Sequence, residues 1–151
     1  MASRRIAFLL AQLGAESSAA FEQAVAQLGI TPSEAGLLRL IGRNPGISQK
    51  AASESLGVKP SRIVAVLDRL ERRGKIERRR SKTDRRSHEI HLTPDGERTL
   101  AALRPIAEAH EEAFTKGLSE SELAQLATYL ETIAASRGLS RDIHRNTGPR
   151  T

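Results

Sequence analysis

The chain has 151 residues, a formal net charge of +6 and a hydrophobic content of 38%, with one Tyr, three Phe and no Trp. This length suits a single domain, and its largely aliphatic core favours packed helices over a β-sandwich. The absence of cysteine excludes disulfides, thiolate zinc sites and thiol redox sensing. No apolar run approaches the roughly 18 residues of a membrane span, so we expect a cytoplasmic protein with no membrane partner.

The positive charge is concentrated in one segment. Residues 59–86 contain twelve basic and four acidic residues, a net charge of +8, whereas the rest of the chain carries −2. A localised basic patch on an otherwise near-neutral chain is typical of proteins that bind a polyanion. The alternative is an ordinary solvated surface, which usually mixes the two signs.

Three helices are expected in the first part of the chain. Apolar residues at helical spacing predict a long first helix over about residues 4–28. In "TPSE", Thr31 and Glu34 form a capping box around Pro32, which opens a second helix that ends at the turn "RNPG". Ser48 then caps a short third helix.

The stretch "VKPSRIVAVLDRLERRGK" predicts a fourth helix that begins at Pro60 and ends before Gly74. A β-hairpin follows, with Ile76 in its first strand and Ile90 and Leu92 in its second, joined by the polar loop "RSKTDRRS". The apolar stripe of the fourth helix is formed by Ile63, Val66, Leu67 and Leu70.

Two helices and a tail complete the chain. "TPDGE" starts a helix over about residues 95–116, and a second capping box at Ser119 opens a last helix to about Ser136. The segment 137–151 is polar and basic, and we expect it to be a flexible tail.

A short helix, a tight turn, a further helix and a charged hairpin together describe a winged helix-turn-helix. In this motif the second helix, here residues 59–73, lies in the DNA major groove. Arginine on its outward face can bind guanine in a bidentate manner, although ordinary surface charge is the alternative. Lys59 is a weak helix cap but adds a phosphate contact. The residues expected to contact DNA from this helix are Lys59, Ser61, Arg62, Ala65 and Arg69.

The hairpin loop is expected to reach the phosphates and the neighbouring minor groove, where a narrow groove concentrates negative potential. A carboxylate in such a loop can accept backbone N–H bonds at the turn or orient a neighbouring arginine. The wing residues expected at the DNA are Arg80, Lys82, Asp84, Arg85 and Arg86.

The order of elements and the motifs "LGITPSEAGLLRLI" and "LDRLERRGKIERRRSKTDRRS" resemble the multiple-antibiotic-resistance-regulator (MarR) family of winged-helix transcription factors over about residues 6–135. The resemblance implies that Arg86 enters the minor groove and that Asp68 orients this wing arginine through an ion pair. The alternative for Asp68 is an intrahelical pair with Arg72, four residues later.

The resemblance also implies an obligate homodimer in which the first helix and the last two helices interleave. Independently, these helices carry more apolar positions than a small winged helix can cover. We therefore expect a mainly α fold in one domain, residues 1–136. It would combine a winged helix-turn-helix at 31–93 with dimerisation helices at 4–28 and 95–136. Two-fold symmetry predicts a palindromic operator with half-sites roughly 34 Å apart.

Members of the family often respond to small phenolic or carboxylate ligands, held in a wedge between the dimer helices and the DNA-binding lobe. Phe8, Leu38 and Arg39 are candidates to lie near such a wedge, but buried core or ordinary surface is the favoured reading of each. The ligand-binding residues are left unassigned.

Other functional sites have little support in the sequence. His88 and His91 lie three apart in a strand, so they point to opposite faces and form a poor metal pair. His110 with Glu111 and Glu112 could be a zinc fragment, but an exposed helix surface is favoured. No catalytic constellation or phosphate-binding loop is present, so we expect neither an enzyme nor a bound cofactor.

The sequence is therefore interpreted as a sequence-specific DNA-binding transcriptional regulator, acting as a homodimeric repressor released by a small aromatic or carboxylate-type effector. Two alternatives stay open. One is a sequence-tolerant, chromosome-organising DNA-binding protein, and the other is a metal-responsive regulator.

Overall fold

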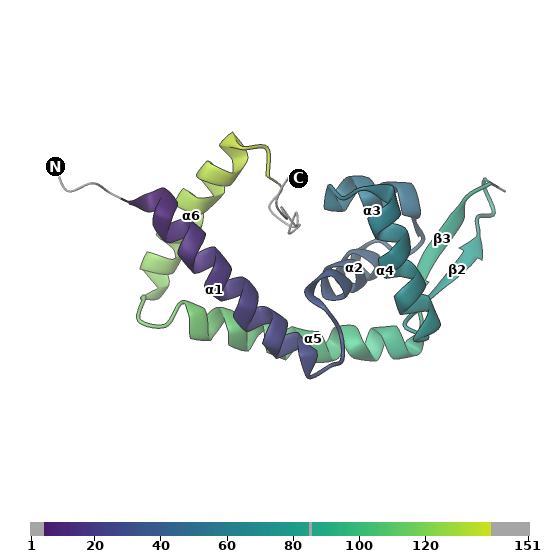
Figure 1. Ribbon diagram of the computed structural model, residues 1–151, viewed down its shortest axis with the longest axis horizontal. Coiled ribbons are helices and arrows are strands. Elements are labelled where there is room, and N and C mark those ends of the chain that lie inside the picture. The colour runs from purple at the N-terminus through teal and green to yellow at the C-terminus, as the bar shows by residue number, and fades with distance from the viewer. Residues whose placement is uncertain (1–4, 85, 140–151) are drawn as a thin grey trace.

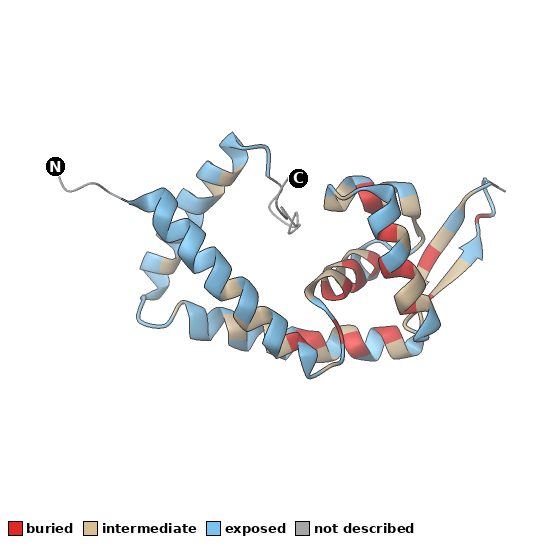
Figure 2. Cartoon of the chain, viewed as in Figure 1, coloured by how far each residue is buried: buried red, intermediate tan, exposed pale blue. Residues whose placement is uncertain are grey.

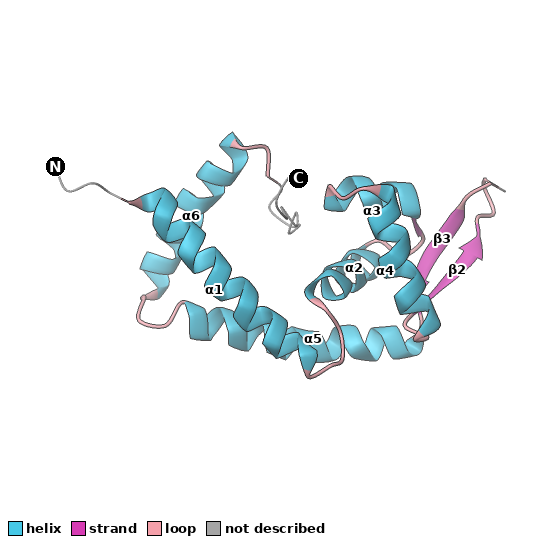
Figure 3. Cartoon of the chain, viewed as in Figure 1, coloured by secondary structure: helices cyan, strands magenta, loops and turns pink. Residues whose placement is uncertain are grey.

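The computed structural model describes residues 5–84 and 86–139, which form a mainly helical fold with a small antiparallel sheet (Figure 3). Within these residues no helix has both the length and the hydropathy needed to cross a membrane. The predicted winged-helix fold class is confirmed. In chain order the elements are α1 (Ile6–Ala26), α2 (Pro32–Arg43), β1 (Ile47–Ser48), α3 (Gln49–Leu56), α4 (Pro60–Arg72), β2 (Ile76–Arg80), β3 (His88–Leu92), α5 (Pro94–Phe114) and α6 (Glu120–Ser136).

The helix starts follow the capping residues that the sequence indicates. The Glu34 N–H donates to Thr31 Oγ1 at 3.2 Å, and the Thr31 N–H donates back to the Glu34 carboxylate at 2.8 Å. Ser119 and Glu122 form the same reciprocal box at the start of α6. The backbone N–H and then the hydroxyl of Ser119 hold the pKa of Glu122 below its ordinary value. Lys59 gives α4 no side-chain cap, as predicted.

The sheet joins the hairpin to the helix-turn-helix. The strand order is β1-β3-β2, with both pairings antiparallel. In the hairpin, Ile76 lies opposite Leu92 and Arg78 lies opposite Ile90. Strand β1 was not predicted, since it has only two residues and exists through its pairing of Ile47 with Ile90.

The hydrophobic core lies in the winged-helix lobe. Figure 2 shows buried residues gathered in α2, α3, α4 and the first part of α5, with a few others in the sheet and the wing loop. The predicted stripe of α4 is buried, and Ile76 and Ile90 attach the hairpin to it. The core residues are Val25, Ile30, Ala35, Leu37, Leu38, Ile41, Ala52, Ile63, Val66, Leu67, Leu70, Ile76, Ile90 and Leu103.

Helix α5 starts in close contact with Lys75, the residue directly before β2. The Thr93 N–H donates to the Lys75 carbonyl at 3.1 Å, and Lys75 Nζ donates to Asp95 Oδ2 at 2.6 Å. A Cβ on Gly96 would lie 1.9 Å from the same carbonyl oxygen, so this position requires glycine. The first turn of α5 is thereby fixed to the base of the wing.

The terminal helices form a second arm with almost no core of its own. Helix α5 runs along the base of the molecule and joins the winged-helix lobe to α1 and α6 (Figure 1). Val25 is the one buried residue of α1, and α6 has none. The large hydrophobic side chains that are exposed in the described residues all lie in residues 6–13 and 114–139.

Candidate nucleic-acid interface and adjacent groove

Helix α4 presents an outer face opposite its buried apolar stripe. Because an α-helix has about 3.6 residues per turn, the residues farthest from the stripe are Ser61, Ala65 and Arg72. All three are exposed. Small side chains beside a guanidinium allow close approach to base edges. Ser61 and Ala65 were predicted on this face, whereas Arg72 was missed.

Asp68 lies on the flank of α4 next to the wing. Its Oδ1 accepts a hydrogen bond from Nη2 of Arg78 at 2.5 Å, and the Glu71 carboxylate accepts one from Nη1 at 3.0 Å. Nε of Arg78 is buried without a hydrogen-bond partner among the described residues. The structure thus pairs Asp68 with Arg78 and not with the expected Arg86. Arg78 is in the strand packed on α4, while Arg86 belongs to the loop at the far end of the hairpin.

Arg69 lies on the opposite flank of α4, towards α2. Its Nε donates to Oε1 of Glu34 at 3.4 Å, and Nη1 of Arg73 lies 3.6 Å from the other carboxylate oxygen. Glu34 is only 2% exposed, and a buried carboxylate is costly unless it is paired. Arg69 was predicted to point outward, but the buried acid draws its guanidinium onto α2.

The wing loop is organised by its own polar side chains. The Arg86 N–H donates to Asp84 Oδ1 at 2.9 Å, and the Ser87 N–H donates to the Asp84 carbonyl at 3.0 Å. Ser81 is buried, and its Oγ accepts weak bonds from the N–H groups of Thr83 and Asp84, each at 3.3 Å. The expectation that Asp84 accepts backbone N–H bonds at the turn is confirmed. Its carboxylate therefore shapes the loop.

The wing exposes a row of cations. The side chains of Arg80, Lys82 and Arg86 are exposed along the end of β2 and the loop. Arg79 is also exposed but pairs with Glu77 on its own strand. The predicted contact residue Arg85 lies outside the described residues. The cations of this wing and the outer face of α4 together form a surface that we call the basic face.

The histidines make local contacts. His91 Nε2 lies 3.4 Å from the Glu89 carboxylate. The Ser81 hydroxyl first, and His91 second, lower the pKa of Glu89 below its ordinary value. His110 shares a hydrogen bond of 3.1 Å with Ser17 Oγ between α5 and α1. In residues 5–84 and 86–139 no three His, Asp or Glu side chains are grouped as metal ligands would be.

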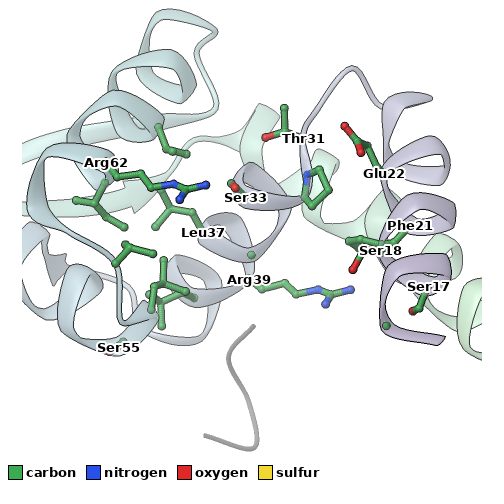
Figure 4. Close-up of a pocket in the computed structure, with 18 of the residues that line it drawn as sticks. Ser17, Ser18, Phe21, Glu22, Thr31, Ser33, Leu37, Arg39, Ser55 and Arg62 are labelled. Atoms are coloured by element: carbon green, nitrogen blue, oxygen red, sulfur yellow. The ribbon is translucent and has the colours of Figure 1, made fainter. Parts of the chain in front are cut away.

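A groove of about 1100 Å³ separates α1 from α2 and α4. Its apolar wall includes Phe21, Leu37 and Val66, and serine hydroxyls line both sides (Figure 4). The charged residues of its described lining are Glu22, Arg39, Arg43 and Arg62. Three cations against one carboxylate give the groove a positive character.

Arg39 extends across this groove from α2 towards α1 (Figure 4). Its guanidinium carbon lies 5.9 Å from the ring centroid of Phe21, a cation–π distance. Burial first, and the neighbouring charge of Arg43 second, lower the pKa of Arg39 below its ordinary value. An anion bound here would offset both effects, because a nearby opposite charge favours the charged guanidinium. Of the other two wedge candidates, Leu38 is fully buried in the core and Phe8 is exposed on α1, and neither lines the groove.

Two residues that organise the site were missed at the sequence level. Arg78 could have been found by strand alternation, since it shares a face of β2 with the core residue Ile76. Arg72 could have been found by extending the outer face of α4 by two turns from Ala65. No signal within the sequence indicated that Arg69 would turn to Glu34.

Comparisons with known proteins agree with this arrangement. The profile of the MarR family matches residues 28–87, which hold the helix-turn-helix and the first strand and loop of the hairpin. The transcriptional regulator HosA of Escherichia coli is 33% identical over 123 residues, which cover 81% of this chain and 90% of HosA. A Thauera aromatica protein named as a transcriptional regulator of the hcr operon is 37% identical over 105 residues, 70% of this chain. The chain spans 63% of the length of that relative.

Two solved structures share the fold. A transcriptional repressor, CouR, bound to a 23-mer DNA duplex has a TM-score of 0.78 at 36% identity, covering 85% of this chain and 91% of that one. CouR from Rhodococcus jostii RHA1 bound to p-coumaroyl-CoA has a TM-score of 0.75 at 28% identity, covering 87% of this chain and 93% of that one.

Proposed function

The chain belongs to the MarR family of transcriptional regulators, and we propose that it is a homodimeric repressor of a palindromic operator, released by a small effector. The observation that carries the proposal is the basic face, where a recognition helix of small side chains lies beside an exposed cationic wing. The CouR repressor, 36% identical and bound to a DNA duplex in its solved structure, supports DNA binding by this chain.

The proposed DNA contacts divide by function. Ser61, Arg62 and Ala65 on α4 would read base edges in the major groove, with Arg72 added to the predicted set. Lys59 would contact phosphate at the start of the same helix.

On the wing, four cations would neutralise phosphates and reach the minor groove: Arg80, Lys82, Arg85 and Arg86. Three residues would act indirectly. Asp84 would shape the loop, Asp68 would hold the hairpin to α4, and Arg69 would brace α4 on α2.

Homodimerisation is proposed because α1 and α6 leave a large apolar surface uncovered. A single chain covers no side chain of α6 completely, and Leu9, Leu13 and Tyr129 are each more than half exposed. Water-exposed apolar area of this extent is typical of an interface. The occupant that fits best is a second copy of the same helices, since both arms carry the same kind of surface and most oligomers are two-fold symmetric.

The effector is proposed to be an aromatic or carboxylate-type anion that binds in the groove. Phe21 and Leu37 offer apolar contact, and Arg39 offers a partly desolvated cation without a carboxylate partner among the described residues. The p-coumaroyl-CoA complex of a 28% identical CouR makes aromatic acyl-CoA esters the first compounds to examine. A ligand that binds the DNA-free conformations more tightly would shift the population away from the operator-competent state.

Competition binding tests the DNA-binding proposal. A duplex recovered by the wild-type protein from a random-sequence library should be bound on the order of a thousandfold more tightly than random duplex at physiological salt. Fluorescence anisotropy with unlabelled competitor measures this ratio. Equal affinity for both duplexes would instead identify a sequence-tolerant, chromosome-organising protein.

The Arg86→Ala variant tests the wing. Losing one phosphate contact should weaken binding to every duplex and reduce the slope of log affinity against log salt by about 1. Arg104→Ala is the matched control, since Arg104 is an exposed cation of α5 that pairs with Glu108 away from the basic face. Wild-type affinity and salt slope in Arg86→Ala would remove this residue from the interface.

The Arg39→Gln variant tests the groove. Calorimetry should detect p-coumaroyl-CoA binding to the wild-type protein, and the variant should bind it at least tenfold more weakly while keeping wild-type affinity for DNA. Free p-coumarate serves as the comparison that separates the aromatic acid from the CoA part.

Stoichiometric zinc in the purified protein, with DNA affinity that depends on it, would favour a metal-responsive regulator instead.

A further inference from the structure

Arg62 occupies a position that belongs to two surfaces at once. It follows Ser61 on the exposed first turn of the recognition helix α4, and its side chain also lines the groove. Figure 4 shows its guanidinium extending towards Ser33 at the start of α2, while Arg39 extends into the same groove from the middle of α2. Among the described residues, the Arg62 side chain makes no hydrogen bond or ion pair.

The contrast with Arg69 shows why this freedom matters. The two arginines are seven residues apart, about two helical turns, so they lie on the same flank of α4. Arg69 is held by the buried carboxylate of Glu34. Among the described residues no carboxylate pairs with Arg62, because the charged groove residues on α2 are Arg39 and Arg43 and the groove carboxylate, Glu22, lies on α1 at the opposite side. Its long, unrestrained side chain can therefore turn into the groove or outward to DNA.

We infer that Arg62 is shared between the DNA interface and the groove, so that an anionic group bound in the groove competes with DNA for the same guanidinium. The inference rests on the proposed DNA-binding function. It also adds a route to release, because capture of Arg62 weakens the DNA contact directly, before the two lobes of a dimer change their spacing.

The surroundings of Arg62 indicate the chemistry of the competing group. The Ser33 hydroxyl from α2 lies in front of the Arg62 guanidinium, the Ser55 hydroxyl from α3 also lines the groove, and Arg39 and Arg43 add positive charge. Hydroxyls beside guanidiniums suit a carboxylate or a phosphate, which accept several hydrogen bonds in a charge-assisted manner. The ligand class is therefore an anion whose apolar part lies between Leu37 on α2 and Phe21 on α1.

A carboxylate built into the groove tests this competition without knowledge of the effector. Ser33 is the second residue of α2, where the helix dipole stabilises a negatively charged side chain. The Ser33→Glu variant should therefore fold. Its carboxylate would capture Arg62. Affinity for the duplex selected by the wild-type protein should fall roughly tenfold or more, the amount associated with losing one bidentate base contact. The isosteric control Ser33→Gln should leave affinity unchanged.

The double variant Ser33→Glu/Arg62→Gln decides the mechanism. If Arg62 is the shared group, Arg62→Gln alone weakens binding by a similar factor, and Ser33→Glu has no further effect in its presence. An equal loss from Ser33→Glu with or without Arg62 would indicate general repulsion of DNA and overturn the inference. Wild-type affinity in Arg62→Gln would overturn it as well.

Arg86→Ala separates failure of the inference from failure of the proposed function. If Arg86→Ala weakens binding and Arg62→Gln does not, DNA binding stands and the shared role of Arg62 is wrong. If the wild-type protein selects no duplex, the proposed function and the inference both fail. Circular dichroism and melting temperatures within a few degrees of wild type exclude unfolding as the cause of any loss.

Discussion

At the scale of single residues, the ion pair between Lys75 and Asp95 makes the stability of the protein depend on pH in the acidic range. The hydrogen bond from Lys75 Nζ, at 2.6 Å, is the main cause that lowers the pKa of Asp95 below its ordinary value. A carboxyl group whose pKa is lower in the folded state stabilises the fold above its unfolded pKa, near 4 for Asp. This contribution is lost as the pH falls through the folded pKa.

The Asp95→Asn variant should therefore be less stable than wild type at pH 7, and the difference should shrink as the pH falls below about 4. Urea unfolding followed by circular dichroism between pH 7 and pH 3 measures both curves. Arg98 also contacts Asp95, with 3.3 Å between Nη2 and Oδ1, but its side chain is exposed. Arg98→Gln is therefore the control that should leave the pH dependence largely intact. Parallel curves for Asp95→Asn and wild type would show that this pair does not carry the effect.

Gly96 and Gly42 provide a matched pair of glycines. A Cβ on Gly96 would lie 1.9 Å from the Lys75 carbonyl oxygen, whereas one on Gly42 would be too close only to the tip of the Leu100 side chain, at 2.5 Å, with Leu92 at an ordinary contact distance. We expect Gly96→Ala to lower the free energy of unfolding by about 3 kcal/mol, because backbone must move. Gly42→Ala should stay within about 1 kcal/mol of wild type, since a side chain can rotate and alanine favours the helix. Chemical denaturation would contradict this account if the two variants were equally stable.

At the scale of elements, the hairpin is fastened to the recognition helix by Arg78, which binds both Asp68 and Glu71 of α4. These groups are partly exposed, so the ion pairs contribute only about 1 kcal/mol to stability. Their larger effect should be geometric. Arg78→Gln should leave the melting temperature nearly unchanged but weaken DNA binding, because the wing would no longer be held at a fixed angle to α4.

A double variant checks that Arg78 acts through the wing. If its effect on affinity passes through the wing cations, Arg78→Gln should weaken binding less in an Arg86→Ala background than in wild type. Fluorescence anisotropy on the selected duplex measures both steps. Additive losses would indicate that Arg78 acts independently of Arg86.

The elements themselves could be predicted because their signals are local. The capping box of Thr31 and Glu34, the apolar stripe of α4 and the polar loop between two short strands each lie within a few residues. Strand β1 could not be predicted, since its two residues are extended only because β3 lies beside them. The same limit applies to ion pairs. The partners of Asp68 and Arg69 depend on which elements pack together. Asp68 was expected to pair with Arg86 but pairs with Arg78, and Arg69 was expected to face outward but pairs with Glu34.

At the scale of the whole molecule, the exposed apolar surface of α1 and α6 has the clearest consequence. If a second copy covers it, folding and association are coupled and the melting temperature should rise with protein concentration. Leu130→Asp, on the apolar face of α6, should shift the protein towards monomer in sedimentation equilibrium. Thr128→Asp is the matched control, because Thr128 lies on the opposite side of the same helix. A wild-type protein that sediments as a monomer would contradict the proposed dimer.

The most direct test of the whole account is the dependence of affinity on the separation of the two operator halves. A symmetric dimer places two recognition helices about one helical turn apart, so inserting five base pairs at the centre of the selected palindrome turns one half-site to the opposite side of the duplex. Anisotropy measured on the original and extended duplexes should show affinity falling to that of random DNA. Equal affinity for the two duplexes would contradict the claim that two lobes of one dimer bind the operator together.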